Sequence, residues 1–222
     1  MPVDEFASLR WSMVQIVALY VQHSSAEIGK EALDDKVMQA LARVPRHEFV
    51  PSEVRPYAYH DGPLPIGYDK TISQPFIAAL MTDLLDIRRT DKVLEVGTGL
   101  GYHTALLAEL ADKVYSVEII EELAAQAQAN LENAGYDNVE LRIGDGSRGW
   151  PQHAPFDRIL VAAAAELIPP MLLQQLAPGG RMVIPTGIQE EQRLTLVEKA
   201  ADGRVRTTDI LPVRFALLES YH

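Results

Sequence analysis

The sequence contains no cysteine, few aromatic residues and no long apolar segment. Without thiols the chain has no disulfide, no cysteine nucleophile and no sulfur-ligated metal site, which is typical of proteins in the reducing cytosol. No apolar run reaches the roughly 18 residues that a membrane-spanning helix requires. Asp4 and Glu5 stand where a signal peptide would carry basic residues. We therefore expect no signal peptide, no membrane partner and a cytoplasmic location.

The sequence also lacks a cluster of basic residues. Its 20 lysines and arginines are outnumbered by 31 acidic residues, and the formal net charge is −11 at pH 7. A nucleic-acid-binding protein needs a basic face that displaces counterions from phosphates, so we expect no nucleic-acid partner. The histidines are scattered without ligand spacing, which predicts no metal site. Because an acidic protein repels acidic substrates at long range, a carboxylate substrate would have to be held by local donors.

The first 90 residues show two helical patterns and a long irregular segment. Apolar residues at helical spacing predict helices over residues 6–21 and 33–44, the second of which ends at Pro45. The polar segment 23–30 between them predicts a loop. Residues 51–69 are rich in proline, glycine and tyrosine. We expect them to form an ordered loop with a function, because so long a loop in a compact domain usually has one.

From residue 75 onward, predicted helices and strands alternate. The expected helices cover residues 75–85, 102–110, 120–134 and 168–176, and the expected strands 93–96, 113–117, 139–143, 156–162, 181–184, 194–199 and 209–217. Such alternation implies right-handed crossovers and a mostly parallel sheet with helices on both faces. We therefore predict one doubly wound, Rossmann-like α/β domain over residues 1–222. Residues 1–90 would form its N-terminal helical cap and long loop, and residues 91–222 its core and C-terminal strands.

A glycine-rich turn, Gly97-Thr98-Gly99-Leu100-Gly101, follows the first strand of this core, which carries Glu95 near its end. Glycines let the backbone turn sharply and approach a ligand closely, and open α/β sheets bind ligands at this edge. The G-x-G-x-G spacing differs from the G-x-G-x-x-G of dinucleotide sites, and no basic phosphate-binding residue is present. Alone, the turn could also be a tight connection that binds nothing.

Acidic residues mark the ends of the next two strands. The carboxylate of Glu118 could accept hydrogen bonds from both hydroxyls of a ribose. Asp145, followed by Gly146, could accept one from an adenine amino group. Either carboxylate alone could instead be a helix N-cap. Together with the glycine turn, the pair resembles the site of S-adenosyl-L-methionine (AdoMet) methyltransferases, so we predict AdoMet rather than NAD as the cofactor.

The segment Thr71-Ile72-Ser73-Gln74-Pro75 lies just upstream of the glycine turn, after His47–Pro51 and Asp61–Gly67. With these segments the chain resembles the protein-L-isoaspartate (D-aspartate) O-methyltransferase family over most of its length. The resemblance implies carboxyl methylation of isoaspartyl residues in aged proteins and peptides, which initiates their repair, by a monomer. It assigns the catalytic position to Ser73. The chain departs from the family pattern at Asp69-Lys70, where a glycine and a glutamine are usual.

Several side chains could act on the substrate or the cofactor. A carboxylate acceptor is ionised near pH 7 and needs orientation rather than a general base, which the Ser73 hydroxyl could provide. Ser73 could also merely cap the helix that starts near Pro75. The predicted substrate-binding residues are Pro65, Ile66, Lys70, Ser73, Val213 and Arg214. The predicted cofactor-binding residues are Thr71, Ile72, Gln74, Glu95, Gly97, Thr98, Gly99, Gly101, His103, Glu118, Ile119, Asp145 and Gly146.

Three of these roles have plain alternatives. Lys70 could supply local positive charge or could be a solvated loop residue. Arg214 could reach the site or could be an exposed charge at a strand edge. His103 fits a packing residue near the cofactor better than an acid or base.

For the function as a whole, the departure at Asp69-Lys70 keeps open an AdoMet-dependent methylation of another peptide aspartate or a small acid. A non-catalytic AdoMet-binding protein is a further alternative, and the presence of Ser73 argues against it.

Overall fold

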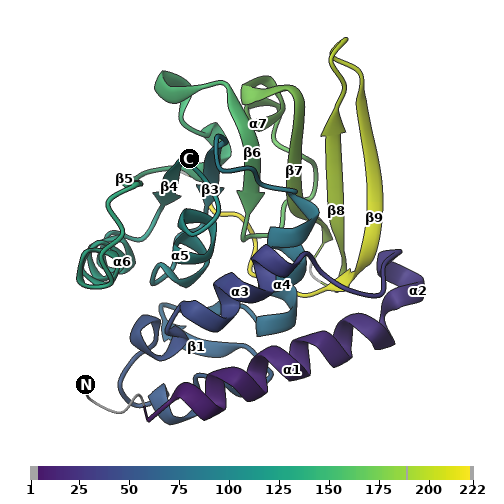
Figure 1. Ribbon diagram of the computed structural model, residues 1–222. Coiled ribbons are helices and arrows are strands. Elements are labelled where there is room, and N and C mark those ends of the chain that lie inside the picture. Colours follow the sequence, from purple (N-terminus) through teal and green to yellow (C-terminus); the bar gives the residue numbers. More distant parts are fainter. Residues whose placement is uncertain (1–4, 189, 221–222) are drawn as a thin grey trace.

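A seven-stranded sheet forms the centre of the computed structural model, which describes residues 5–188 and 190–220 (Figure 1). The strand order is β5-β4-β3-β6-β7-β8-β9. The strands are β3 (Lys92–Val96), β4 (Lys113–Glu118), β5 (Val139–Ile143), β6 (Phe156–Val161), β7 (Leu176–Ile188), β8 (Glu191–Lys199) and β9 (Val205–Val213). Strands β5, β4, β3, β6 and β7 run parallel, and β8 and β9 are antiparallel additions. The predicted doubly wound, mostly parallel sheet is confirmed.

Helices cover both faces of the sheet, because the parallel strands are apolar on both sides. Helices α4 (Pro75–Leu84), α5 (Tyr102–Ala108) and α6 (Glu121–Asn133) contribute side chains to one buried cluster. Helix α7 (Pro170–Gln175) contributes Leu172 to a second cluster, together with Trp150 and Phe156. The central strands are therefore buried between two apolar layers, and their carboxyl ends all point to one edge of the sheet.

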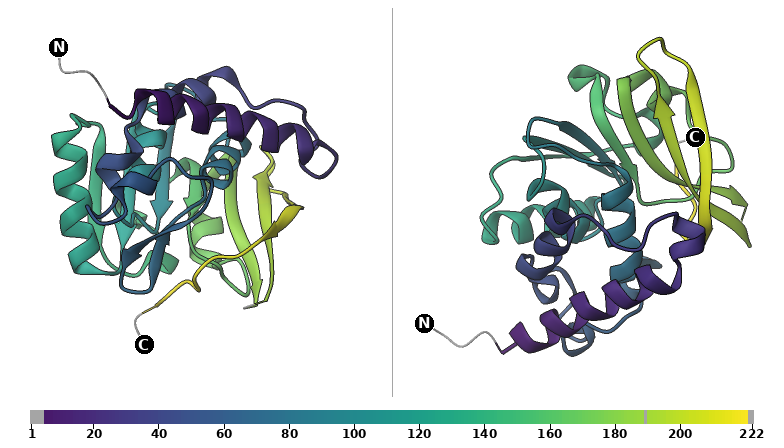
Figure 2. Two further views of the ribbon diagram at one scale, coloured as in Figure 1. Left: turned by 90° about the horizontal axis from the view of Figure 1, so that it is seen from below. Right: turned by 45° about the vertical axis from the view of Figure 1, so that its right-hand side comes forward.

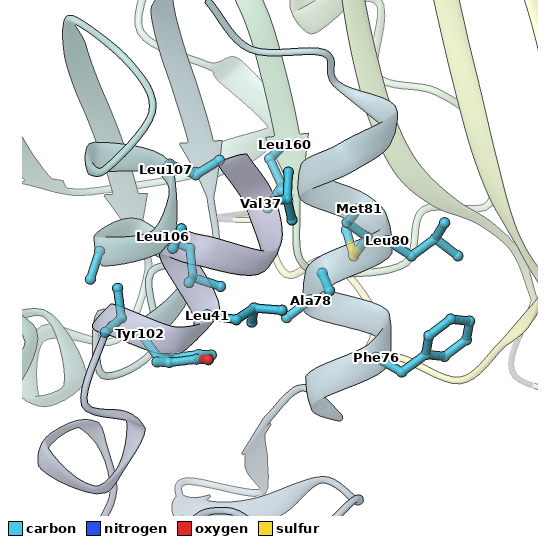
Figure 3. Close-up of a cluster of buried hydrophobic side chains, with 14 of the residues drawn as sticks. Val37, Leu41, Phe76, Ala78, Leu80, Met81, Tyr102, Leu106, Leu107 and Leu160 are labelled. Carbon is cyan, nitrogen blue, oxygen red and sulfur yellow. The ribbon is translucent and has the colours of Figure 1, made fainter. Parts of the chain in front are cut away.

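The N-terminal cap lies below that edge. Helix α1 (Ala7–His23) runs across the bottom of the view and packs against α3 (Asp35–Arg43) and α4 (Figure 1). Val37 and Leu41 of α3 lie between side chains of α4 and α5 (Figure 3). Asp34 caps α3 by accepting a hydrogen bond from the Lys36 N–H at 3.0 Å. The cap is thus joined to the α/β core by a continuous apolar layer.

Two of the predicted loops contain regular structure. Residues 23–30 hold a short helix, α2 (Ser25–Ile28), which ends at Gly29 in the left-handed conformation (φ 74°). Within residues 51–69 and just beyond, β1 (Leu64–Gly67) and β2 (Lys70–Ile72) form a hairpin. Its turn residues, Tyr68 and Asp69, both have φ 55°, as a type I′ turn requires. The predicted loops at these two places were therefore wrong in part.

The last predicted strand also differs from the structure. Strand β9 ends at Val213, and the following residues turn back below the carboxyl ends of the neighbouring strands (Figure 2, left). The Ala164 N–H donates to the Ala216 carbonyl at 2.8 Å, and the Leu218 N–H donates to the Ala164 carbonyl at 2.7 Å. We call residues 214–219 the C-terminal tail. It leaves the sheet because its backbone pairs with the segment after β6.

In the part of the chain that the structure describes, no helix combines the length and the apolar character that crossing a bilayer demands.

Candidate active site

A cavity of about 540 Å³ lies between the carboxyl ends of the central strands and the β1–β2 hairpin. One side, here called the glycine wall, consists of residues 96–100, 117–119 and 146. The opposite side, the Ser73 wall, consists of residue 66, residues 70–74 and residues 212–219. The cavity therefore unites most of the predicted site residues, although Pro65, Glu95, Gly101 and Asp145 do not line it.

Glycine is required in the glycine wall for geometric reasons. Gly99 has φ 57°, and a Cβ at this position would stand 3.1 Å from Ile66 Cδ1 of the β1–β2 hairpin. A Cβ on Gly146 would lie 2.3 Å from Val96 Cγ1. Side chains here would crowd the β1–β2 hairpin or push strand β3 aside. The wall is therefore shaped for close approach of a ligand to the backbone.

Glu118 holds the glycine turn in place. Its Oε2 accepts a hydrogen bond from the Gly99 N–H at 2.8 Å. Its Oε1 accepts from the N–H groups of Ile119 at 2.9 Å and Ile120 at 3.1 Å. A carboxylate offers about four acceptor positions, so Oε2 keeps capacity for a ligand hydroxyl. The carboxylate lines the cavity at the end of β4, where the sequence predicted it.

Glu95 lies behind the glycine wall rather than in the cavity. It is fully buried, and its Oε2 accepts hydrogen bonds from Thr104 Oγ1 and Ser116 Oγ, both at 2.5 Å. Because Ser116 donates its proton to Glu95, the Thr98 hydroxyl donates to Ser116 at 2.6 Å. Burial raises the pKa of Glu95 to about 7. The predicted direct contact with the cofactor is therefore replaced by a supporting role beneath the turn.

Asp145 uses its side chain as a helix cap. Its Oδ1 accepts hydrogen bonds from the Ser147 N–H at 2.9 Å and from Ser147 Oγ at 2.6 Å, at the start of the short 3-10 helix Gly146–Arg148. This is the alternative that the sequence left open. Gly146 itself lines the cavity. Contact of Asp145 with an adenine amino group stays a prediction; its second oxygen, Oδ2, lies 3.5 Å from Arg148 Nε.

Ser73 stands between β2 and α4 and lines the cavity opposite the glycine turn. The N-cap of α4 is Gln74, with no side-chain capping bond. In the described part of the chain, Ser73 Oγ has no hydrogen-bond partner, so the alternative role of Ser73 as a helix cap is wrong. A half-buried hydroxyl without a protein partner, facing a cavity, is available to a ligand.

Lys70 and the C-terminal tail meet at the rim of the cavity. Lys70 Nζ lies 2.5 Å from Glu219 Oε1, and both residues line the cavity. Lys70 is therefore not a freely solvated loop residue. Arg214 also lines the cavity, and it is exposed, one residue beyond the end of β9. Its position therefore fits both its predicted reach to the site and the exposure that the alternative expected. Val213 and Ile66 complete this wall, whereas Pro65 points away from it.

His103 lines the cavity but is engaged by the protein. Its Nε2 lies 2.9 Å from Thr82 Oγ1, and burial lowers the pKa of His103 to about 3. The imidazole is therefore neutral near pH 7, so His103 has no imidazolium proton to donate as a general acid. Among the described residues, no group of three or more acidic, cysteine or histidine side chains is arranged to hold a metal ion.

Sequence reasoning missed several parts of the cavity. Apolar residues from distant segments line it, and their composition carries no functional signal: Phe49, Tyr102, Ala162, Ala163, Phe215, Leu217 and Leu218. Glu219 was also missed, because only the fold brings it to Lys70. Arg46 was missed although it donates from Nη2 to the Ser73 carbonyl at 2.7 Å. Nothing in the sequence marks an arginine as buried, since most arginines are exposed.

Comparison with known proteins adds independent information. Residues 25–221 match the family model of protein-L-isoaspartate(D-aspartate) O-methyltransferase. The chain is 60% identical over 219 residues to protein-L-isoaspartate O-methyltransferase 1 of Polaromonas sp., covering 99% of this chain and 93% of that protein. It is 56% identical over 220 residues to protein-L-isoaspartate O-methyltransferase 2 of Syntrophobacter fumaroxidans, covering 99% and 89%.

Solved structures show the same architecture. A protein-L-isoaspartate O-methyltransferase structure superposes with a TM-score of 0.82 at 28% identity, and the match covers 94% of this chain but only 65% of that longer one. A second structure, of a putative protein-L-isoaspartate O-methyltransferase from Plasmodium falciparum in complex with S-adenosyl-L-homocysteine, has a TM-score of 0.75 at 21% identity. That match covers 93% of this chain and 98% of that one, and it shows the shared fold.

Proposed function

Because this chain belongs to the protein-L-isoaspartate(D-aspartate) O-methyltransferase family, we propose that it catalyses the family's reaction in the cavity beside Ser73. The reaction is the transfer of a methyl group from AdoMet to the carboxylate of isoaspartyl residues in damaged proteins, which initiates their repair. The observation that carries the assignment is the Ser73 hydroxyl, which lines the cavity opposite the glycine turn and has no partner among the described residues.

The side chains of the cavity suit an acceptor that is already ionised. A carboxylate is deprotonated near pH 7 and needs no base to activate it. His103, neutral and bonded to Thr82, is not poised as one. What the protein must supply is orientation within about 3–3.5 Å of the methyl group. The Ser73 hydroxyl donates a hydrogen bond to one carboxylate oxygen and leaves the other oxygen to accept the methyl group.

The glycine wall is where AdoMet fits, and there it supplies an activated methyl group. Gly99 and Gly146 line this wall with bare backbone, and a Cβ at either position would crowd Ile66 or Val96. Glu118 would accept from the ribose through its remaining acceptor capacity, and the Gly146 end of the wall would receive the adenine. The sulfonium end would then lie toward Ser73. Cofactor and acceptor thus occupy opposite walls of one cavity.

The rim of the cavity suits an anionic substrate segment. Lys70 and Arg214 are the basic residues among those lining the cavity. Lys70 is paired with Glu219, whereas Arg214 forms no ion pair within the described residues. Arg214 would therefore attract the acceptor carboxylate, and an incoming peptide would compete with Glu219 for Lys70. We further propose that the chain acts as a monomer and does not bind nucleic acid, in keeping with its net charge of −11.

Two matched peptides test the function directly. They carry an L-isoaspartyl or an L-aspartyl residue at one position and are otherwise identical. With isotope-labelled AdoMet, we expect methyl transfer to the isoaspartyl peptide only. Transfer to both peptides would favour a broader carboxyl methyltransferase, and transfer to neither would refute the proposal. A single peak of about 25 kDa in light scattering would support the monomer, since the chain mass is 24.6 kDa.

A further inference from the structure

Arg46 is a fully buried charged residue, with 0% of its surface exposed. It starts the 3-10 helix Arg46–Phe49 below the cavity. Its Nε donates to the Ala58 carbonyl at 2.8 Å, and its Nη2 donates to the Ser73 carbonyl at 2.7 Å. Its third nitrogen, Nη1, is buried and has no hydrogen-bond partner among the described groups. The side chain thus binds two main-chain carbonyls and forms no ion pair in the described part of the chain.

The same guanidinium also reaches the glycine side of the cavity. Its central carbon lies 4.7 Å from the ring centroid of Tyr102, the first residue of α5 directly after the glycine turn. Tyr102 lines the cavity and belongs to the apolar layer between α3, α4 and α5 (Figure 3). A cation over an aromatic face is attracted by the ring. One side chain therefore joins the segment that carries Ser73 to the helix that begins at the glycine turn.

Stability alone does not explain this residue. Removing a charge from water is costly unless a partner of opposite charge compensates it, and an apolar side chain of similar size is often at least as stabilising. Arg46 forms no ion pair among the described residues: Asp61 is near enough to favour its charged form, but Asp61 Oδ2 accepts a hydrogen bond from Gln74 Nε2 instead. One donor of Arg46 is left unused. Violations of the rules of core packing are expected at functional sites. Arg46 donates a hydrogen bond to the carbonyl of Ser73, which links this buried charge to the proposed acceptor side of the cavity.

We propose that Arg46 is a positioning residue for methyl transfer, which fixes Ser73 through its carbonyl and keeps a positive charge beneath the acceptor carboxylate. It does not touch the substrate, because it is completely covered. Lys70 cannot replace this charge while it is paired with Glu219. The inference rests on the proposed role of Ser73. Together with Arg214, Arg46 would give this chain of net charge −11 a local positive charge for a carboxylate substrate.

Two substitutions separate the charge from the hydrogen bonds. Arg46→Lys keeps the charge but loses the planar fork, and Arg46→Met removes both while keeping the length. The concentration of folded cofactor sites is first determined by titration with S-adenosylhomocysteine, and each rate is divided by it. A partly unfolded preparation then still gives a rate per folded molecule. We expect Arg46→Met to lower kcat/KM for an isoaspartyl peptide by roughly 10²-fold, as a small misplacement of a reacting group does. Arg46→Lys should lose about 10-fold, and S-adenosylhomocysteine affinity should change less than about 3-fold in both.

Arg158 offers a matched control. It is a second buried arginine, on β6, paired with Asp91 at 3.2 Å and away from the cavity. Arg158→Met should lower the melting temperature but leave kcat/KM per titrated site unchanged. The proposal is overturned if Arg46→Met behaves like this control. If Arg46→Met does not fold, Arg46→Lys decides, and full activity in that variant would overturn the proposal. Absence of methylation by the unsubstituted protein would instead refute the proposed function.

Discussion

The glycine wall and the Ser73 wall of the cavity differ in how the chain builds them. The glycine wall comes mainly from one turn, fixed from behind by the buried hydroxyls around Glu95 and from the side by Glu118. The Ser73 wall comes from a hairpin and a tail about 150 residues apart, joined at the surface by Lys70 and Glu219. Cofactor binding therefore depends on a local, buried arrangement, and acceptor binding on distant segments. Substitutions that remove a side chain from one wall should leave the role of the other intact.

The largest expected effect is on the glycine wall. Gly99→Val places a branched side chain at φ 57°, where its Cβ would lie 3.1 Å from Ile66 Cδ1. Backbone strain and crowding together should weaken AdoMet binding by roughly 10³-fold in a folded protein. Gly203→Val is the matched control, because Gly203 also has a positive φ (85°) but has open space around it in the β8–β9 hairpin. Calorimetry that finds equal cofactor affinity in both variants would contradict the role of the turn.

Ser73→Ala should have the next largest effect, and on the opposite wall. Loss of a preorganised donor to the reacting carboxylate should reduce methyl transfer by about 10²–10³-fold. AdoMet affinity and thermal stability should hardly change, because Ser73 Oγ has no partner among the described residues. Ser12→Ala, at an exposed serine of α1 that bonds only to its own helix, serves as the control. Unchanged single-turnover rates in Ser73→Ala would show that the acceptor is oriented elsewhere.

Glu118→Ala should weaken AdoMet binding by about 1.5–3 kcal/mol, the range for hydrogen bonds to a charged group. The rate at saturating AdoMet should change less, because the acceptor wall is untouched. The substitution also removes the acceptor of the Gly99 N–H, so part of this loss in affinity would come from a less ordered turn. Glu132→Ala on the exposed side of α6 is a control of equal charge change. A slower rate with normal cofactor affinity would argue against ribose binding.

The smallest effect on turnover is expected for Glu95→Gln, which instead changes the pH dependence of stability. The pKa of Glu95 is raised from 4.5 to about 7 by burial, so the folded protein binds this proton more tightly than the unfolded chain. That contribution is complete below about pH 4.5 and is lost as the pH rises through about 7. Glutamine accepts the same two hydroxyl bonds without titrating. The unfolding free energy of Glu95→Gln should therefore fall less between pH 4.5 and 7 than that of the unsubstituted protein. Parallel curves of unfolding free energy against pH for the two proteins would contradict the raised pKa of Glu95.

The local signals of the glycine wall made it predictable from sequence. A strand followed by G-x-G-x-G, and Glu118 at the end of the next strand, are patterns of a few neighbouring residues. The Ser73 wall depends on tertiary structure instead. Pro63 and Pro65 obscured the β1–β2 hairpin, because proline is accepted only in edge strands. No short pattern could reveal that Glu219 meets Lys70, or that Arg46 is buried beneath Ser73.

The independence of the two walls is tested most directly by combining Ser73→Ala with Glu118→Ala. Methyl transfer to an isoaspartyl peptide is measured for both single variants and the double variant, with AdoMet far below its KM. Because the two side chains share no hydrogen-bond partner, the loss in the double variant should equal the product of the single losses within about twofold. A double variant no slower than the slower single variant would contradict the account, since it would mean that both residues act as one unit.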